Sequence, residues 1–236
     1  APELLLDDLV ATYREHYAGG GILEFPVYPG ITAVLAALAD HGFTPTAIAA
    51  RLTYASAPDS LQGALAAGLL GGGSRFLGVT EDCAHFLAGE LVRIGELPTT
   101  QDGWDAVALE SVRLQREKGK FVPGLGHPVH KQGDPRTPVL MQLARDNGTF
   151  GPHLSLFESI GRVHSQVLGK TLPLNGAGVC GAVLADVGLP MGVMRGVALL
   201  ARCAGLLGHL VEEQTHPVGI DIYMNVDRNI DYQPPK

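Results

Sequence analysis

The sequence predicts an all-α protein, and three observations carry that prediction. Long runs of β-branched or alternating residues are almost absent from the 236 residues. Segments rich in Ala and Leu recur instead, and helix-start signals precede several of them. The 31 glycines and 16 prolines are dispersed without a Gly-X-Y period, which excludes collagen and favours short connections between helices. Only 17% of the residues are charged and 46% are apolar, so the chain has ample material for a buried core.

The predicted helices follow one another from residue 45 onward. Thr44 is an N-cap residue placed before Pro45, which suits the first position of a helix. The glycine run Gly71–Gly73 ends the next helix. The tail from Asn225 to Lys236 is polar and is predicted to be an arm. The predicted spans are Pro45–Tyr54, Leu61–Leu70, Thr80–Ile94, Asp102–Lys118, Pro135–Arg145, Leu154–Leu168, Gly178–Asp186 and Met191–Glu213.

The charge balance excludes some classes of partner. With 17 basic and 24 acidic residues, the net charge of −7 gives no bulk attraction to nucleic acid or to anionic lipid. The most hydrophobic stretch, Gly192–Val211, contains Arg195, Arg202 and His209. A buried or semi-buried helix is therefore predicted there rather than a membrane span, and we expect neither a nucleic-acid nor a membrane partner.

The three cysteines indicate the compartment. Cys83, Cys180 and Cys203 are an odd number, lie far apart, and each stands in a stretch of small and apolar residues. That pattern favours buried thiols in a reducing compartment over disulfides. No signal-peptide pattern is visible, so we expect a cytoplasmic protein.

The most unusual local sequence is the loop 123–131, PGLGHPVHK, which an Asp-Pro-Arg run follows. Gly124 and Gly126 let the backbone bend closely around whatever His127 faces. A histidine on such a loop can donate a hydrogen bond to a carbonyl or carboxylate, or move a proton near neutral pH. Arg136 ends the Asp-Pro-Arg run in the first turn of the next helix, and its guanidinium suits a bidentate pair with a carboxylate.

Plainer interpretations of the same loop stay open. His127 is also consistent with an ordinary loop histidine, and Asp134 with a helix cap. A metal site at His127 and His130 has no clustered carboxylate or cysteine to complete it, so the sequence predicts no metal.

A second candidate set lies on the last predicted helix. Arg195, Arg202 and His209 are seven residues apart and line one stripe of an otherwise apolar helix. Charged groups in such a setting need a partner anion. Both a structural salt bridge, for instance to Glu212 or Glu213, and a bound carboxylate ligand fit this pattern.

Four short motifs stand along the chain in a fixed order: Ala39-Asp40-His41-Gly42, then Arg75-Phe76-Leu77-Gly78, then Gly124-Leu125-Gly126-His127 with Asp134-Pro135-Arg136, and finally Arg202 and Gly205 followed by His209. In this order they resemble the citrate synthase superfamily, specifically the branch containing citryl-CoA lyase and the C-terminal module of ATP-citrate lyase. The resemblance runs from about Leu35 to Tyr223.

The resemblance implies a citrate-synthase-like all-α fold of two unequal helical domains with a cleft between them. Residues 1–90 and 166–236 are the expected large domain, and residues 91–165 the small one. Relatives assemble from dimers upward, and apolar, glycine-rich helices suit a subunit interface, so we expect a homodimer or a larger homo-oligomer.

The resemblance also implies small-molecule substrates, namely citrate or oxaloacetate and an acyl-CoA, with coenzyme A entering as the thioester. It implies these roles: His41 and His127 as catalytic residues; His41, His127, Arg136, Arg202 and Arg75 as substrate-binding residues; Lys131, Lys120, Gly124 and Gly126 as coenzyme A-binding residues. For the two lysines, a solvated surface is the plain alternative.

The expected activity is carbon–carbon lysis of citryl-CoA, or of a related hydroxyacyl-CoA, to acetyl-CoA and oxaloacetate. Arginines would clamp the carboxylates, and histidine would polarise a carbonyl. This chemistry requires no metal or redox cofactor. Condensation of the citrate synthase type is the alternative, although Phe76 stands where citrate synthases proper have a histidine and so favours the lyase.

One position departs from the family. Its Asn-Val-Asp motif bears the catalytic carboxylate, whereas this chain reads Asn175-Gly176-Ala177. Asp186 lies nine residues beyond Ala177, more than two helical turns away, and is a poor substitute by reach. Either another group takes the role of the catalytic carboxylate, or the reaction differs, or the protein binds an acyl-CoA or citrate without catalysing a reaction.

Overall fold

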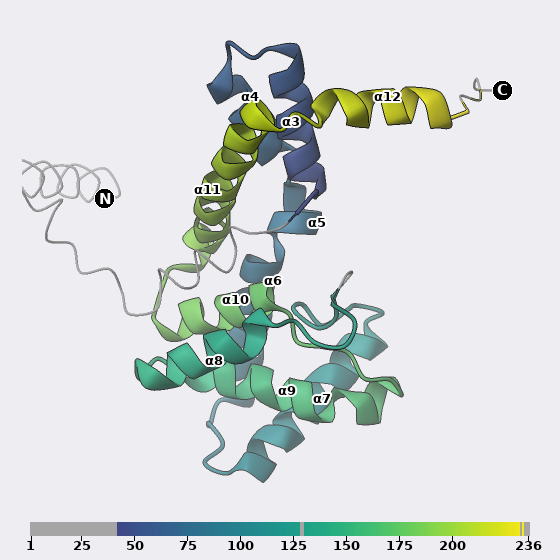
Figure 1. Cartoon of the computed structure of the whole chain (residues 1–236). Coiled ribbons are helices and arrows are strands. Elements are labelled where there is room, and N and C mark those ends of the chain that lie inside the picture. The colour runs from purple at the N-terminus through teal and green to yellow at the C-terminus, as the bar shows by residue number, and fades with distance from the viewer. Residues whose placement is uncertain (1–41, 128–129, 232, 234–236) are drawn as a thin grey trace, which may run out of the picture.

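The structure, a computed structural model, describes residues 42–127, 130–231 and 233. Within this part of the chain all regular secondary structure is helical, apart from one isolated antiparallel bridge between Leu125 and Leu174, so the predicted all-α class is confirmed (Figure 1). The helices are α3 (Pro45–Ser56), α4 (Leu61–Leu70), α5 (Gly73–Leu77), α6 (Val79–Ile94), α7 (Gln101–Glu117), α8 (Arg136–Asp146), α9 (Pro152–Leu168), α10 (Gly176–Asp186), the 3-10 turn η2 (Met191–Val193), α11 (Met194–Thr215) and α12 (Gly219–Asn229).

Local signals account for several helix ends. The span of α4 is the predicted one, and Gly71 caps its C-terminus through a bond to the Ala67 carbonyl. Thr100, rather than Asp102, is the N-cap of α7, because its Oγ1 accepts the Gly103 N–H at 3.2 Å. The α10 helix begins two residues earlier than predicted, since Asn175 caps it in the same way.

Two helices were not predicted. The short α5 starts at Gly73, where the glycine run was expected only to end a helix. The α12 helix runs to Asn229, so the first residues of the predicted polar arm, from Asn225, are helical, and they are exposed. A distant residue starts α12: Glu213 on α11 accepts the Val218 and Gly219 N–H groups, at 3.0 and 2.7 Å. No local pattern reveals such a cap.

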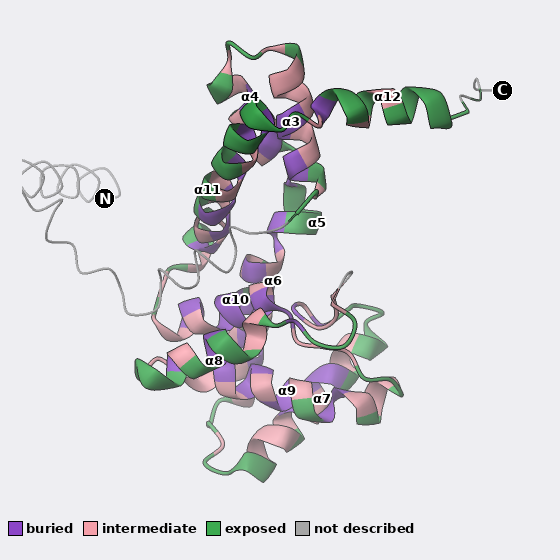
Figure 2. Cartoon of the chain, in the orientation of Figure 1, coloured by how far each residue is buried: buried purple, intermediate pink, exposed green. Residues whose placement is uncertain are grey.

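The described helices pack into two bodies, which Figures 1 and 2 show one above the other. The lower body consists of α6–α10 around the largest buried cluster, with Phe157 and Leu87 among its fully buried members. The upper body consists of α3, α4 and the second half of α11, which bury Ala50, Leu206 and Leu210 between them, with α12 against α3. The predicted domain boundaries at residues 90 and 165, and the predicted cleft, remain predictions.

The long α11 helix joins the two bodies. Its first residue, Met194, is buried with Ala84 of α6 and Leu184 of α10, while its second half packs on α3 and α4. By length and composition alone, Met191–Thr215 would pass for a membrane-crossing helix, a test that core helices of soluble proteins also pass. That α11 has no membrane partner stays a prediction.

Candidate functional site

The histidine-bearing loop, residues 123–136, is tied to the segment that leads into α10. The Gly126 N–H donates to the Pro173 carbonyl at 2.6 Å, and the Asn175 N–H donates to the Gly124 carbonyl at 2.9 Å. From the start of α8, the Thr137 hydroxyl donates to the Leu174 carbonyl at 2.9 Å. Two segments about 50 residues apart in sequence are thereby held as one unit.

Gly124 and Gly178 let this loop and α10 touch backbone to backbone. Gly124 has a φ of +82°, which favours glycine, and a Cβ there would lie 2.7 Å from the Phe157 ring and 2.9 Å from the Gly178 Cα. Gly126, at φ +93°, faces open space instead. Packing against Phe157 and Gly178 therefore accounts for glycine at position 124, while the predicted coenzyme A contacts of Gly124 and Gly126 stay predictions.

Asn175 orients the loop from the N-terminus of α10. Its Oδ1 caps the helix by accepting the Gly178 N–H at 2.9 Å, and its Nδ2 donates to the Gly126 carbonyl at 2.8 Å. Both ends of the amide are used, so the carbonyl of the residue before His127 has a fixed direction.

Asp134 is the centre of the site. Its side chain is fully buried, and its two oxygens accept from Arg136 Nε at 2.9 Å and Nη2 at 2.7 Å, in the fork geometry of a bidentate pair. Oδ2 also accepts the Gly176 N–H at 2.7 Å. Burial alone would raise the pKa of this carboxyl, but the bonds from Arg136 and Gly176 outweigh it and hold the pKa well below its ordinary value. Asp134 is therefore ionised at neutral pH.

Gly176 belongs to the same arrangement. A Cβ at this position would lie 3.1 Å from Arg136 Nε and 3.3 Å from Asp134 Oδ2. The glycine thus leaves the space that the Asp134–Arg136 pair occupies over the first turn of α10.

His127 stands beside this pair with a defined tautomer. Its Nδ1 accepts the His130 N–H at 2.9 Å, so a neutral ring carries its proton on Nε2. Nε2 lies 4.0 Å from Asp134 Oδ2 and 3.5 Å from Arg136 Nη2. Burial, together with the charges of Arg136 and Lys131, lowers the pKa of His127 despite the nearby carboxylate. The site therefore offers a neutral N–H donor next to a guanidinium.

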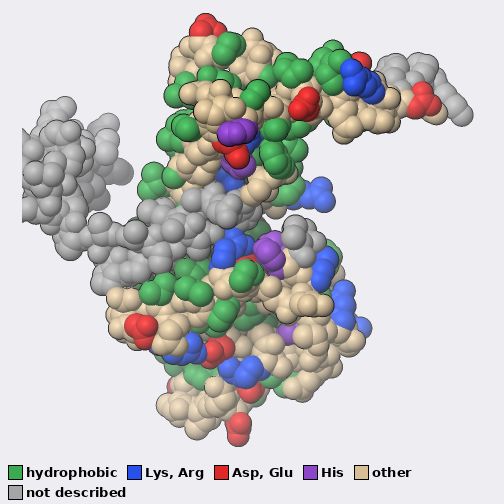
Figure 3. Space-filling view, viewed as in Figure 1, with side chains coloured by type: hydrophobic (Ala, Val, Ile, Leu, Met, Phe, Trp, Pro, Cys, Tyr) green, Lys and Arg blue, Asp and Glu red, His purple; other side chains and the backbone are tan. Residues whose placement is uncertain are grey.

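The structure brings together only some of the predicted site residues. His127, Arg136, Gly124 and Gly126 share the loop, and Figure 3 shows basic and histidine side chains gathered near the junction of the two bodies. The predicted roles of the other residues stay predictions. Arg202 is buried on α11 and Arg75 is exposed on α5, while His41 lies outside the described residues.

Two members of the charged stripe on α11, Arg195 and His209, have charged partners in the structure. Arg195 Nε pairs with Glu81 of α6 at 2.7 Å, and His209 accepts a bond from Arg51 Nη2 at 3.0 Å. Arg195 is therefore in a salt bridge with Glu81 rather than with Glu212 or Glu213, and His209 Nδ1 also lies 3.9 Å from the expected Glu212; for Arg202 both interpretations stay open. Arg51 itself, fully buried on α3, was missed by sequence reasoning because its partners lie about 160 residues away.

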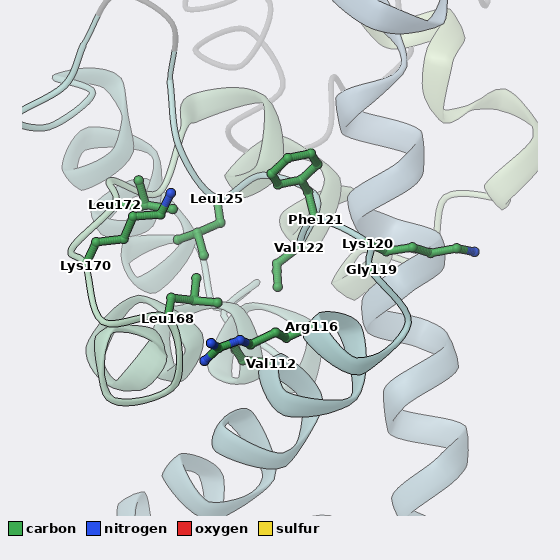
Figure 4. Close-up of a pocket in the computed structure, with 10 residues that line it drawn as sticks. All are labelled: Val112, Arg116, Gly119, Lys120, Phe121, Val122, Leu125, Leu168, Lys170 and Leu172. Carbon is green, nitrogen blue, oxygen red and sulfur yellow. The ribbon is translucent and has the colours of Figure 1, made fainter.

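A pocket of about 290 Å³ opens beside the loop, between the ends of α7 and α9 (Figure 4). Leu125 and Leu172 give it apolar walls, and Arg116 and Lys170 give it positive charge. The predicted Lys120 contributes to the lining, but its side chain extends away from the other lining residues. Arg116 and Lys170 were missed by sequence reasoning, and their only sequence signal is a cation at a helix C-terminus.

Lys131 lines a second pocket of about 590 Å³. Its walls include Asp134 and Thr137 from the loop side and Glu158 from α9. The two pockets share Leu172, which lies in the segment before α10.

Asp186, the carboxylate considered as a substitute for the one missing at Ala177, binds the start of α9 instead. Asp186, at the end of α10, accepts the N–H groups of Gly151, His153 and Leu154 at 2.9–3.0 Å, as well as a bond from the His153 ring. It therefore caps the start of α9. Within the described residues no three His, Cys, Asp or Glu side chains cluster as metal ligands would; that the protein needs no metal stays a prediction.

Comparison with known proteins decides the family. A family model described as the citrate synthase C-terminal domain matches residues 30–220, which include the loop, α10 and α11. The chain belongs to the citrate synthase family. This citrate synthase-like chain is similar to citryl-CoA lyase of Hydrogenobacter thermophilus, with a TM-score of 0.72 and 31% identity over 87% of this chain and 77% of that one. The predicted resemblance is confirmed.

Longer proteins of the citrate synthase family also match. The structure of ATP citrate lyase from Methanothrix soehngenii in complex with citrate and coenzyme A has a TM-score of 0.68 and 25% identity, over 87% of this chain and 34% of that one. An Arabidopsis thaliana ATP-citrate synthase beta chain is 28% identical over 194 residues, 75% of this chain. The chain spans only 30% of that relative's length.

Proposed function

We propose that the protein cleaves the carbon–carbon bond of citryl-CoA, or of a related hydroxyacyl-CoA, to acetyl-CoA and oxaloacetate. The observation that carries the proposal is the cluster in which buried Asp134 holds Arg136 beside the neutral ring of His127. The likeness to a citryl-CoA lyase at 31% identity supports it.

The cluster suits the chemistry of a retro-Claisen step. The hydroxyl proton leaves to a base, the bond between the carbinol carbon and the α-carbon of the thioester breaks, and its electron pair forms the thioester enolate. The α-carbon is then protonated, which releases acetyl-CoA. Arg136 holds a substrate carboxylate, and the Nε2–H of His127 donates to the oxygen on which negative charge develops.

Coenzyme A is the proposed thioester carrier. The pocket beside the loop combines apolar walls with Arg116 and Lys170, which suits a pantetheine chain that ends in phosphates. Lys131, on the other pocket, supplies a further cation. The relative that was solved with citrate and coenzyme A supports this assignment.

Incubation with citryl-CoA, with acetyl-CoA measured over time, tests the lyase. We expect turnover, and we expect His127→Ala to lower the rate by about 10²–10⁴, the range for loss of one acid–base or donor group. His85→Ala, which removes an exposed histidine from α6, is the matched control and should keep the parent rate. An unchanged rate in His127→Ala would contradict the proposed site. The same assay started from acetyl-CoA and oxaloacetate measures the condensation alternative.

A second function, binding without catalysis, is favoured by one specific observation. Position 177 has no carboxylate, Asp186 caps α9, and Asp134 is paired with Arg136 and buried. Neither of these two carboxylates is placed to accept a proton from a ligand. A protein with this site would hold an acyl-CoA or citrate and leave it intact.

Restoring the family carboxylate separates the two functions. If the chain is a binder, Ala177→Asp should raise citryl-CoA cleavage more than tenfold, about 1.4 kcal/mol of barrier, whereas Ala177→Asn should not. A parent protein that already turns over at about 1–10³ s⁻¹, the usual range for enzymes, would contradict binding alone. Calorimetry measures the binding of citrate and of coenzyme A, which both functions require. A parent protein that binds neither ligand would contradict both functions.

We also propose a homodimer or larger homo-oligomer that uses the exposed face of α11. That face carries apolar and small side chains near heptad spacing, with Leu200 61% and Val211 62% exposed. Small residues between larger apolar ones let a second helix approach closely. The residues of this face are Val193 at the end of η2 and, on α11, Gly196, Leu200, Ala204, Leu207, Gly208 and Val211.

Analytical ultracentrifugation tests the assembly. We expect a dimer or larger species at micromolar concentration, and a shift towards the 24.8 kDa monomer in the double variant Leu200→Glu, Leu207→Glu. Leu70→Glu places the same charge on an exposed leucine of α4 and should leave the mass unchanged. A monomeric parent, or a double variant with the parent's mass, would overturn the interface.

A further inference from the structure

A buried histidine lies beneath residues 169–175, the segment that connects α9 to α10. His164 of α9 is only 1% exposed. Its Nδ1 lies 2.9 Å from the Ile160 carbonyl oxygen, and its Nε2 lies 2.8 Å from the backbone nitrogen of Leu172, whose N–H donates to it. Both ring nitrogens therefore have hydrogen-bond partners, as a buried polar side chain requires.

These two partners fix the tautomer of His164. A carbonyl oxygen can only accept, so Nδ1 carries the proton and donates it to Ile160. A backbone N–H can only donate, so Nε2 is the unprotonated acceptor for Leu172. The α9 helix thus offers the connecting segment one acceptor of fixed direction, supplied by a side chain.

A neighbouring residue on the same face of α9 holds the segment a second time. Gly161 precedes His164 by three positions, so the two residues share one face of the helix. A Cβ at Gly161 would lie 2.7 Å from Leu174 Cδ1, which shows that the Leu174 side chain packs directly on the helix there. His164 holds Leu172, two residues earlier. This face of α9 therefore sets the path of the segment.

The segment held in this way forms one wall of the pocket beside the loop. Leu172 lines that pocket, and so do Lys170 of the same segment and Leu168 at the end of α9. Figure 4 shows these three side chains together on one side of the pocket. Because Lys170 is only two residues from Leu172, a movement of the Leu172 backbone would displace both an apolar wall and a cation of the pocket.

The cluster around Asp134 is supported separately, from the start of α10. The Gly176 N–H donates to Asp134 Oδ2, and Asn175 Nδ2 donates to the Gly126 carbonyl. Neither bond involves the His164 ring. The two halves of the proposed site thus have different supports, and one can be loosened while the other is kept.

We propose that His164 is a positioning residue that holds the 170–172 wall of the coenzyme A pocket through the Leu172 N–H. The identity of the ligand rests on the proposed function, whereas the placement of the wall rests on the hydrogen bonds of His164. His164 is buried and does not touch the ligand in this assignment. Without its acceptor the Leu172 N–H has no partner, and the segment must move to bring that group to water. The expected result is weaker binding of coenzyme A with citrate binding preserved.

Two amide replacements separate the two bonds of His164. The amide oxygen of His164→Gln reaches the place of Nε2 and can accept the Leu172 N–H, while the donor to Ile160 is lost. The amide of His164→Asn reaches only the place of Nδ1, so it keeps the bond to Ile160 and leaves the Leu172 N–H without an acceptor. We expect the Asn variant to bind coenzyme A more than tenfold more weakly, about 1.4 kcal/mol, and the Gln variant to stay within about threefold of the parent.

Calorimetry with coenzyme A and with citrate separately is the measurement, and both variants should keep citrate affinity within about threefold of the parent. Asp186→Asn is the control for stability, because Asp186 caps the opposite end of the same helix. It should bind coenzyme A as the parent does. Equal losses of coenzyme A affinity in the Gln and Asn variants, a comparable loss in Asp186→Asn, or parallel losses for both ligands would each overturn the proposal.

Hydrogen exchange in the parent keeps the proposal testable if the Asn variant does not fold. Saturating coenzyme A should slow exchange of the Leu172 amide, because the ligand would cover the wall that this residue forms. Saturating citrate should leave that amide unchanged. The same exchange rate at Leu172 with and without bound coenzyme A would contradict the proposed wall.

Exchange at Leu172 also distinguishes this proposal from the proposed function. A parent protein that binds no coenzyme A would contradict the proposed function, while the anchoring by His164 can still be measured without any ligand. We then expect faster exchange of the Leu172 amide in His164→Asn than in the parent and in His164→Gln. Equal exchange in all three proteins would show that His164 does not hold the segment.

Discussion

Replacing Arg51 by Met lowers the free energy of unfolding by about 3–5 kcal/mol, the usual cost of removing one partner of a buried ion pair. The loss comes from Glu213, whose side chain is only 2% exposed and would remain buried without its cation. Met fills much the same volume, so the expected effect is electrostatic rather than a cavity. Urea unfolding followed by circular dichroism at pH 7 measures it.

Two further variants test whether the orphaned carboxylate of Glu213 causes the loss of stability in Arg51→Met. Replacing Arg195 by Met breaks the half-exposed pair with Glu81 and should cost less than about 1 kcal/mol. Adding Glu213→Leu to Arg51→Met removes the orphaned carboxylate and should recover part of the stability. An Arg51→Met variant as stable as Arg195→Met would show that the buried pair is not what holds α3 to α11.

The same pair predicts a pH dependence. Burial would raise the pKa of Glu213, but hydrogen bonds from Arg51 and from the Gly219 N–H lower it below the ordinary 4.5. A folded-state pKa below the unfolded one gives stability that is complete above the unfolded pKa and is lost as pH falls through the folded one. The difference between Arg51→Met and the parent should therefore be largest at neutral pH and shrink as the pH falls below about 4.5.

Replacing Asp134 by Asn weakens citrate binding by more than tenfold, about 1.4 kcal/mol, and leaves coenzyme A binding close to that of the parent. Asn can still accept the Gly176 N–H with its oxygen, but it cannot accept both Arg136 bonds, because one of its two positions is now an NH₂. Arg136 therefore loses the fork that directs it, and His127 loses its anionic neighbour. Calorimetry with each ligand measures the two affinities.

Asp186→Asn is the matched control for this prediction. Asp186 is also a buried carboxylate that accepts backbone N–H groups at the start of a helix, so its replacement should cost comparable stability. It holds α9 rather than Arg136, and citrate affinity should therefore be unchanged. If both variants lose citrate affinity equally, Asp134 acts only through the stability of the lower body, and its assigned role is wrong.

Most helices were predictable because their signals are local. The spans of α4 and α6 agree with the predicted ones to within one residue, since Ser60, the Gly71–Gly73 run and Gly95 stand at their ends. The start of α12 was not predictable, because Glu213, a residue of another helix, caps it. Fold class and family thus followed from local pattern and motif order, whereas the buried ion pairs needed the three-dimensional structure.

In the site, too, contacts between residues close in sequence were predictable, whereas contacts between distant residues were not. His127 and Arg136 lie nine residues apart on one loop and helix start, so their meeting could be expected from the chain itself. Asp134 read only as a helix cap, since its bond to Gly176 spans 42 residues. Gly124 packs against Gly178 of α10, a contact that no single-segment pattern contains, and its predicted role in coenzyme A binding stays a prediction.

The three thiols differ in a way that makes the native protein convenient to label. Burial raises the pKa of Cys180 to about 12 and that of Cys83 further still, so neither forms a thiolate at working pH. Cys203 is partly accessible and stands on α11 beside Ala204 of the face proposed for assembly. A maleimide spin label or fluorophore added to the unmodified protein would therefore attach at one place, and subunit exchange could be followed without first removing any cysteine.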